Sequence, residues 1–266
     1  MNDRLPAKQS LGQNFLVDAN LARKMVAALK AAPGEPVLEI GPGTGALTRF
    51  LLEVCETLTA VEIDQRLVPG LREQFGDRLE LIHADILNVD LTTLSETKGA
   101  RLVVLGNLPY YASSPILFHL IKHRAAIDRA VVTLQQEVVE RCAAKPGTKV
   151  YGSLTVQIAL AAQVKKLFTL SPHAFRPRPK VASAVMLLDF TRPAPLAPKS
   201  AAMLEKVLRA AFGQRRKQIH NSLAAAFGTE TAARMLAAAG IDPRARAETL
   251  SPETFVHLAD LFFEQR

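Results

Sequence analysis

The feature that most constrains the fold of this chain is a short apolar segment that runs directly into a glycine-rich turn. Residues 36–40 are apolar apart from Glu39, and the sequence Gly41-Pro42-Gly43-Thr44-Gly45 follows them. Glycine adopts backbone conformations that other residues avoid, and its missing side chain lets the main chain approach a bound nucleotide closely. The segment therefore predicts the first strand and turn of a mainly parallel α/β sheet.

The following segments repeat this alternation of strands and helices. Further strands are predicted at residues 57–63, 79–83, 101–106, 129–134 and 181–190, and helices at 115–122 and 151–163. Strands that alternate with helices favour a doubly wound, Rossmann-like sheet with both faces covered. We therefore expect an α/β domain over residues 1–192.

After a proline-rich segment, the pattern becomes purely helical. Three prolines fall within residues 191–200, and helices are predicted at 203–227, 231–239 and 252–263. Gly228 and Gly240 are suitable helix ends. Within the first of these helices, Phe212, Ile219 and Leu223 share one face, which should pack inward. We expect a small all-helical domain over residues 193–266.

Positive charge is concentrated in one part of the chain. The 266 residues include 33 Lys and Arg against 25 Asp and Glu, a formal net charge of +8. Residues 141–192 hold nine basic residues and one acidic residue, whereas the rest of the chain is balanced. Such a block suits a polyanion such as nucleic acid, although an ordinary solvated basic face is an alternative.

Composition argues against several other classes of protein. Cys55 and Cys142 lie far apart and fit two reduced thiols, and the six histidines show no metal-ligand spacing. No secretory signal or membrane-spanning segment is visible. We therefore expect a cytoplasmic monomer that binds neither a metal nor a membrane.

The glycine-rich turn and the end of the second strand suggest a nucleotide cofactor. Gly41, Gly43 and Ala46 fit the dinucleotide pattern G-x-G-x-x-A, so an NAD-dependent dehydrogenase must be considered. Glu62 ends the second strand, 21 positions after Gly41, where a carboxylate can accept both ribose hydroxyls. This arrangement fits NAD and S-adenosylmethionine equally.

Two further carboxylates favour S-adenosylmethionine. Glu39 lies next to the turn, where an amino acid with a free ammonium group would bind, and Asp85 follows the third strand, where it could meet an adenine amine. Asp85 could instead cap a short helix. Because carboxyl ends of parallel strands meet at one edge of the sheet, Glu39, Gly41, Glu62 and Asp85 should lie together.

The fourth strand ends in Gly106-Asn107-Leu108-Pro109-Tyr110, which suits methylation of an exocyclic adenine amine. This amine is a poor nucleophile because its lone pair is shared with the ring. The Asn107 side-chain oxygen and the Leu108 carbonyl can accept its two hydrogens and localise that pair. Pro109 shapes the turn and removes a competing donor, and Tyr110 can stack on the base. Catalysis is then mostly alignment.

A second aromatic residue should close the other face of the base. Phe175 is the candidate, because it begins the basic loop Phe175-Arg176-Pro177-Arg178-Pro179-Lys180-Val181. A base held between Tyr110 and Phe175 would have left its stack. Core packing of Phe175 is the alternative, and the flanking Arg176, Arg178 and Lys180 argue against it.

These motifs together resemble the small-subunit ribosomal RNA adenine N6-dimethyltransferases of the KsgA type. The similarity runs essentially end to end, and its motifs are residues 10–16, 39–45, 61–64, 107–110, 175–181, 215–217, 221–223 and 246–250. Tyr111, Ala112, Gln136 and His220 depart from the usual family residues, which could soften RNA contacts without changing the proposed chemistry.

The resemblance implies a class I methyltransferase fold and a set of functional residues. It implies cofactor contacts at Asn14, Leu16, Gly41, Glu62, Asp85 and Asn107. It also implies the transfer of two methyl groups to each of two adjacent adenines near the 3′ end of small-subunit rRNA, in an immature ribosomal subunit. The helical domain would grip rRNA phosphates through Arg215, Arg216 and Lys217.

Three other interpretations remain at this point. A macrolide-resistance type of methyltransferase, which acts on large-subunit rRNA, shares the asparagine motif. A non-catalytic RNA-binding assembly factor can have the same fold. An NAD-dependent dehydrogenase shares the glycine-rich turn. Labelled S-adenosylmethionine or NADH would distinguish these classes.

Overall fold

The computed structural model describes residues 7–8, 11–192, 196–214 and 216–265, and the chain divides into two compact units. The first unit comprises residues 1–139 and 163–192, and the second comprises residues 140–162 and 193–266. This division differs from the expected one, 1–192 and 193–266, because residues 140–162 pack with the C-terminal helices.

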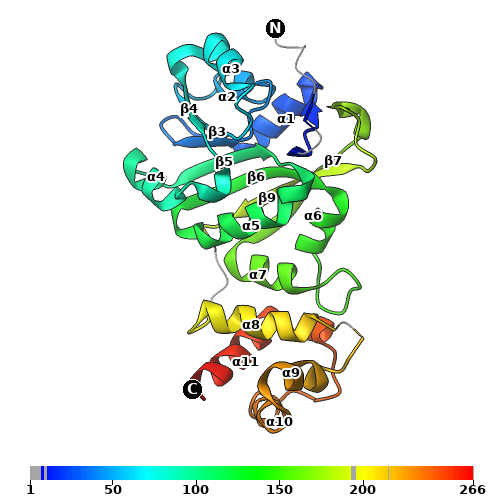
Figure 1. Ribbon diagram of the computed structural model, residues 1–266. Helices are drawn as coiled ribbons and strands as arrows, with labels where there is room; N and C mark the ends of the chain where they lie inside the picture. The colour runs from blue at the N-terminus through cyan, green and yellow to red at the C-terminus, as the bar shows by residue number, and fades with distance from the viewer. Residues whose placement is uncertain (1–6, 9–10, 193–195, 215, 266) are drawn as a thin grey trace. The chain divides into compact units, whose positions relative to one another are not determined.

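A seven-stranded sheet with the order β4-β3-β2-β5-β6-β9-β7 forms the centre of the first unit (Figure 1). Its strands are β2 (Val37–Ile40), β3 (Leu58–Glu62), β4 (Leu79–His83), β5 (Leu102–Asn107), β6 (Ile127–Gln135), β7 (Gln163–Leu170) and β9 (Ser183–Asp189). The pairs from β4 to β6 are parallel, whereas β6–β9 and β9–β7 are antiparallel. The predicted α/β sheet is therefore confirmed, with β7 as an additional strand.

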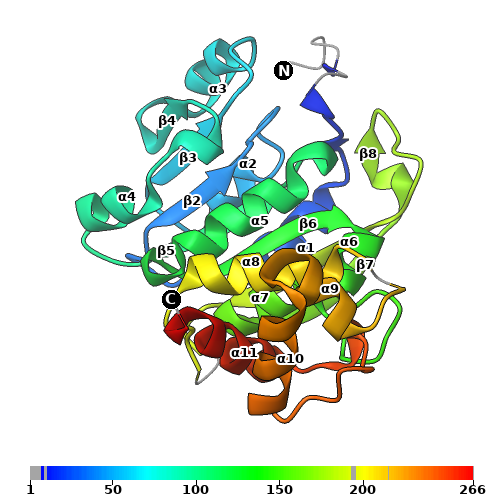
Figure 2. The same cartoon turned by 60° about the horizontal axis from the view of Figure 1, so that its bottom comes forward.

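Helices cover this sheet on both faces (Figures 1 and 2). They are α1 (Ala19–Leu29), α2 (Thr48–Leu51), α3 (Val68–Phe75), α4 (Leu91–Lys98), α5 (Ser113–Lys122) and α6 (Gln136–Cys142). Met25, Leu51 and Leu71, from α1, α2 and α3, share one apolar cluster with strand residues. The strand order reverses between β2 and β5, so right-handed crossovers place α4 and α5 on the opposite face. Ligands bind at the carboxyl ends of strands beside such a reversal.

A two-stranded sheet joins two segments that are far apart in the sequence. β1 (Phe15–Leu16) and β8 (Phe175–Arg176) are antiparallel, with Phe15 opposite Arg176 and Leu16 opposite Phe175. This pairing brings the segment before α1 against the start of the basic loop at residues 175–181.

The second unit is helical and has its own apolar core. Its helices are α7 (Ser153–Ala161), α8 (Ala201–Phe212), α9 (Ile219–Phe227), α10 (Thr229–Ala238) and α11 (Pro252–Glu264). Tyr151 is 1% exposed and lies in the same cluster as Val207 and Phe255. The Tyr151 hydroxyl also donates to the Leu250 carbonyl at 2.8 Å. These contacts explain why residues 140–162 belong to this unit.

The single helix predicted over residues 203–227 is wrong. α8 ends at Phe212, and α9 begins at Ile219. The N–H groups of Ile219 and His220 donate to the carbonyls of Ala245 and Pro243, at 2.7 and 3.2 Å, rather than to a preceding helical turn. Ile219 and Leu223 are nonetheless fully buried, as their spacing predicted.

Two negative findings apply to the described part of the chain. Its helices include none with both the length and the apolar character needed to cross a lipid bilayer. Its His, Cys, Asp and Glu residues form no group of three that could hold a metal ion.

Candidate active site

The glycine-rich turn connects β2 to α2 at the carboxyl edge of the sheet. Gly43 has a φ of +60°, a conformation that favours glycine. A Cβ at this position would lie 3.1 Å from the ring of Phe15. The turn therefore requires glycine at residue 43, both for its backbone conformation and for the approach of Phe15.

Glu62 connects this turn to the end of β3. Its side chain is nearly fully buried, with Oε2 accepting from the Gly43 N–H at 3.0 Å and Oε1 from the Asp64 N–H at 2.8 Å. Burial raises the pKa of the Glu62 carboxyl above its usual range. A carboxylate has about four acceptor positions, so acceptor capacity remains for a hydroxyl group of a ligand.

Glu39 is a buried carboxyl group with one oxygen lacking a partner. The Thr48 hydroxyl donates to Oε2 at 2.7 Å, while Oε1 accepts no hydrogen bond from the described residues. Burial raises the pKa of the Glu39 carboxyl to about 8. The residue lines a small hollow together with Gly41, Thr44 and Asn107. An unsatisfied buried acceptor in this hollow fits a cationic or hydrogen-bond-donating ligand group.

Asn107, at the end of β5, points into the same edge of the sheet. Its Nδ2 donates to the Asn14 carbonyl at 2.9 Å, which leaves the amide oxygen as the group available to a ligand. Tyr110 is partly buried, and its hydroxyl lies 2.6 Å from the Ser183 hydroxyl. Leu108 and Pro109 continue the wall of the cleft. The structure thus brings Asn107, Leu108, Pro109 and Tyr110 together with Glu62, Gly41 and Gly43.

The segment before α1 forms the other wall of the cleft. Leu11, Gly12, Gln13, Asn14 and Phe15 line it. The Gln13 amide donates to Asp64 Oδ2 at 2.8 Å, and hydrogen bonds from Arg66 hold the pKa of Asp64 well below its usual range. Of the residues in this segment, the family resemblance indicates Asn14 and Leu16, and the sequence pattern alone gives no signal for them.

Two of the predicted cofactor residues, Leu16 and Asp85, do not line the cleft at Glu62 and Asn107. Leu16 is 4% exposed and reaches the hollow beside Glu39. Asp85 accepts from the Leu87 N–H at 3.0 Å and so caps a short helical turn, which was the alternative interpretation of this residue. Asp85 is not among the residues that line the cleft, and its contact with an adenine amine stays a prediction.

The structure places Phe175 as its alternative interpretation described, in the apolar core, and its contact with a base stays a prediction. Phe175 is 2% exposed and belongs to the apolar cluster of the first unit rather than to the cleft. The reason is the pairing of β8 with β1: side chains alternate along a strand, so Arg176 faces outward and Phe175 inward. As placed here, Phe175 does not offer its ring to a base.

The predicted RNA-binding residues are exposed wherever the structure describes them. Arg176, Arg178 and Lys180 are exposed in or after β8. Arg216 and Lys217 are exposed in the connection between α8 and α9, and Arg215 lies outside the described residues. Exposed cations of this kind are available to phosphates.

Comparisons with known proteins place this geometry in context. The family model described as "Ribosomal RNA adenine dimethylase" matches residues 4–264. A protein of Desulforapulum autotrophicum named "Ribosomal RNA small subunit methyltransferase A" is 43% identical over 264 residues, which cover 97% of this chain and 92% of the relative. A protein of the same name from Xanthomonas axonopodis is 45% identical over 258 residues, covering 96% of each chain.

Solved structures agree on the architecture. A dimethyladenosine transferase from Plasmodium falciparum superimposes with a TM-score of 0.72 at 24% identity, covering 92% of this chain and 95% of that one. The 23S rRNA methyltransferase ErmE gives a TM-score of 0.68 at 26% identity, covering 93% and 99%. The fold is therefore that of the Rossmann-like class I methyltransferases, with a helical C-terminal region.

Proposed function

The chain belongs to the ribosomal RNA adenine dimethylase family. From this premise we propose that it methylates the exocyclic amines of two adjacent adenines near the 3′ end of small-subunit rRNA. The methyl donor is S-adenosylmethionine. One observation carries the proposal. Asn107 presents its amide oxygen at the edge of the sheet where Glu62 and the glycine-rich turn also converge. An acceptor for an amine and a site for a nucleoside thus share one cleft.

The residues of the cleft fit S-adenosylmethionine. When bound, this cofactor supplies an electrophilic methyl group attached to a sulfonium centre. Glu62 retains acceptor positions for the ribose hydroxyls, and the unsatisfied Oε1 of Glu39 is suited to the ammonium group. Gly43 keeps the turn free of side-chain atoms on its Phe15 side. Asn14, Leu16, Gly41 and Asp85 complete the proposed cofactor site.

The remaining residues act on the target adenine. The Asn107 oxygen and the Leu108 carbonyl accept the two amine hydrogens, which pulls the nitrogen toward a tetrahedral shape and localises its lone pair. Pro109 holds the turn in an extended conformation, and Tyr110 offers an aromatic face to the base. No strong base is needed, because the methylated aminium loses its proton readily to water. The chain contributes alignment rather than acid–base chemistry.

The proposed RNA contacts are exposed cations in each unit. We assign phosphate contacts to Arg176, Arg178 and Lys180 in the first unit and to Arg215, Arg216 and Lys217 in the second. Replacing the last three with alanine should weaken rRNA binding for all sequences and lower the salt slope by about 0.7–0.9 per lost contact. Cofactor affinity should not change. An unaltered salt slope would remove these three residues from the interface.

The function is tested by methyl transfer to defined RNA particles. We expect the purified monomer to transfer label from S-adenosylmethionine to immature small subunits, with two dimethylated adenines mapped near the 3′ end of their rRNA. Asn107→Ala should bind the same particles without methylating them. Modification confined to large-subunit rRNA would favour the macrolide-resistance type. RNA binding without any methyl transfer would favour an assembly factor.

A further inference from the structure

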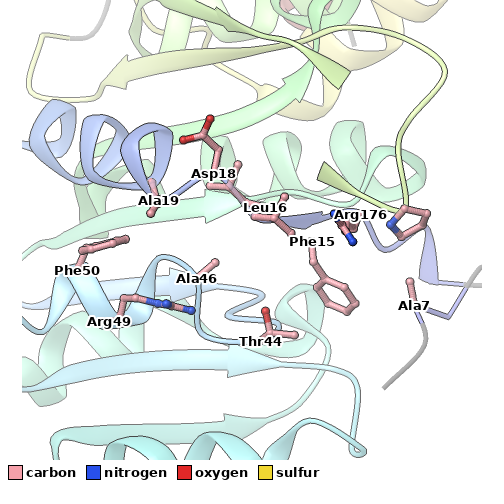
Figure 3. Close-up of a pocket in the computed structure, with 13 residues that line it drawn as sticks. Ala7, Phe15, Leu16, Asp18, Ala19, Thr44, Ala46, Arg49, Phe50 and Arg176 are labelled. Carbon is pink, nitrogen blue, oxygen red and sulfur yellow. The ribbon is translucent and has the colours of Figure 1, made fainter. Parts of the chain in front are cut away.

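A second hollow, lined in part by Phe15, lies in the first unit (Figure 3). It has a volume of about 760 Å³ and runs between the start of α1, the glycine-rich turn, α2 and the end of β8. Of the residues that line the cleft at Glu62 and Asn107, only Phe15 also lines this groove. The groove therefore adjoins the cleft at Phe15. It also adjoins the small hollow beside Glu39, with which it shares Phe15, Leu16, Thr44 and Ala46.

Two arginines from different elements line the groove. Arg49 comes from α2 and Arg176 from β8, and both side chains are exposed. Figure 3 shows Arg49 extended along the wall that carries Ala46 and Thr44, while Arg176 lies beside Phe15. The Arg49 Nε donates to the Gly45 carbonyl at 3.3 Å, so its terminal nitrogens remain available. Neither arginine forms an ion pair with an acidic side chain of the described residues.

One acidic residue also lines the groove, but its charge is already engaged. Asp18 Oδ1 accepts from the N–H groups of Asn20 and Leu21, at 2.9 and 3.1 Å, and so caps α1. In Figure 3 the Asp18 carboxylate points away from Arg49 and Thr44. The charge that the groove offers to a ligand is therefore positive.

The rest of the lining adds aromatic surface and a hydroxyl group. Phe15 contributes a partly buried ring, and Thr44 contributes a hydroxyl. Phe50 also lines the groove, but it is 6% exposed and the Arg23 guanidinium lies over its ring, so it forms a wall rather than a stacking surface. Guanidinium groups bind phosphate through paired hydrogen bonds, and aromatic rings provide stacking surfaces for bases. Two arginines beside the Phe15 ring are suited to a nucleotide rather than to a simple inorganic anion.

We propose that this groove binds a nucleotide of the substrate RNA outside the target adenine, with its phosphate held between Arg49 and Arg176. The proposal rests on the proposed function, since it requires an RNA substrate at the neighbouring cleft. It adds Arg49 to the RNA contacts and places one strand of the RNA across the outer side of β1. The glycine-rich turn then lies between the cofactor and the RNA backbone.

The test compares Arg49→Gln, Arg176→Gln and the double variant with the wild type. Arg72→Gln is the matched control, because Arg72 is an exposed arginine on α3 that lines neither hollow. The probe is a fluorescein-labelled transcript of the 3′ end of small-subunit rRNA, titrated over a series of KCl concentrations. Cofactor affinity is measured separately by calorimetry, and thermal melting reports folding.

Each single variant should weaken RNA binding several-fold. The double variant leaves the phosphate without a cation and should lower the salt slope by about 0.7, and cofactor affinity should be unchanged in all three variants. The double variant should lose less than the product of the two single effects, because both arginines contact one phosphate. Arg72→Gln should match the wild type.

Several results would overturn the proposal. One is an unaltered salt slope in the double variant. Another is a loss of cofactor affinity with normal RNA binding, which would assign the groove to the cofactor. Tight binding of AMP that is abolished by both substitutions, with RNA binding intact, would make the groove a mononucleotide site. Failure of the proposed function is distinguishable, because it would appear as absent or misplaced methylation by the wild type.

Discussion

The substitution Glu62→Gln tests whether one buried carboxylate both shapes the glycine-rich turn and receives the cofactor. Glu62 is 3% exposed and accepts hydrogen bonds from the N–H groups of Gly43 and Asp64 at 3.0 and 2.8 Å. Glutamine has nearly the same shape but only one acceptor oxygen. Its amide NH₂ must therefore face one of these two N–H donors, which is left buried and unsatisfied.

The geometry sets the size of the two expected effects. One unsatisfied buried donor should lower the free energy of unfolding by about 1–3 kcal/mol. In binding, one ribose hydroxyl loses a charged acceptor, which costs about 1.5–3 kcal/mol and raises the cofactor Kd by about 10- to 150-fold. Calorimetric titration with S-adenosylmethionine measures the second effect, and urea unfolding measures the first.

A matched control separates these effects from the loss of a charge. Glu73 is an exposed carboxylate on α3, and Glu73→Gln should leave both the unfolding free energy and the cofactor Kd unchanged. A folded Glu62→Gln protein with the wild-type Kd would refute the assignment of Glu62 to the ribose. A wild-type unfolding free energy would refute the role of its hydrogen bonds in the turn.

Three shorter predictions follow from the same site. Gly43→Ala, at a φ of +60° and with a Cβ 3.1 Å from Phe15, should lower the free energy of unfolding by about 1–2 kcal/mol in chemical denaturation and should weaken cofactor binding. Asn107→Ala should reduce turnover by about 100-fold or more while the RNA Kd in a filter-binding assay changes little. Burial raises the pKa of Glu39 from 4.5 to about 8. As pH rises between these values, the Glu39 carboxyl loses its proton in the unfolded chain but keeps it in the folded one. The free energy of unfolding should therefore fall over this range. Glu39→Gln should remove this decrease from a plot of the free energy of unfolding, measured with urea, against pH. If the variant keeps the wild-type slope, Glu39 is not the group responsible.

The parallel part of the sheet was predictable because its signals are local. β2, β3 and β5 are short, buried and mostly apolar segments, and each ends at or beside a polar or glycine residue. β7 gave no such signal. Its sequence Gln163–Leu170 includes two adjacent lysines and is mostly half-buried or exposed, so only pairing with β9 defines it as a strand. An edge strand of this kind carries too little apolar periodicity to be recognised alone.

The site divides in the same way between local and distant signals. Gly43, Glu62 and Asn107 were identified because each follows or ends a predicted parallel strand, and such ends meet at one edge. The roles of Gln13 and Phe15 were not derivable, because their partners Asp64 and Gly43 lie on distant segments. The same limitation applies to Phe175, whose burial depends on the pairing of β8 with β1.

The helical unit shows how tertiary contacts override helix periodicity. The spacing of Phe212, Ile219 and Leu223 correctly predicted that Ile219 and Leu223 are buried, yet the helix is interrupted between Phe212 and Ile219. Hydrogen bonds from Ile219 and His220 to residues 243–245 replace those of a continuous helix. Because of this interruption, Arg216 and Lys217 lie on the segment that connects α8 to α9 and not on one face of a continuous helix.

The hydrogen bond between Asn107 and Asn14 explains why the Asn107 side chain turns its amide oxygen, and not its NH₂ group, toward the cleft. A backbone carbonyl only accepts, so the Asn107 NH₂ group must face Asn14, and the amide oxygen is left toward the cleft. An adenine amine offers hydrogens and needs this acceptor, whereas the opposite orientation would set a donor against a donor. Since Asn14 contributes a main-chain group, the position of its backbone matters more than its side chain for this purpose. The anchoring of that segment, through Gln13 on Asp64 and Phe15 against Gly43, therefore determines the polarity of the reaction site.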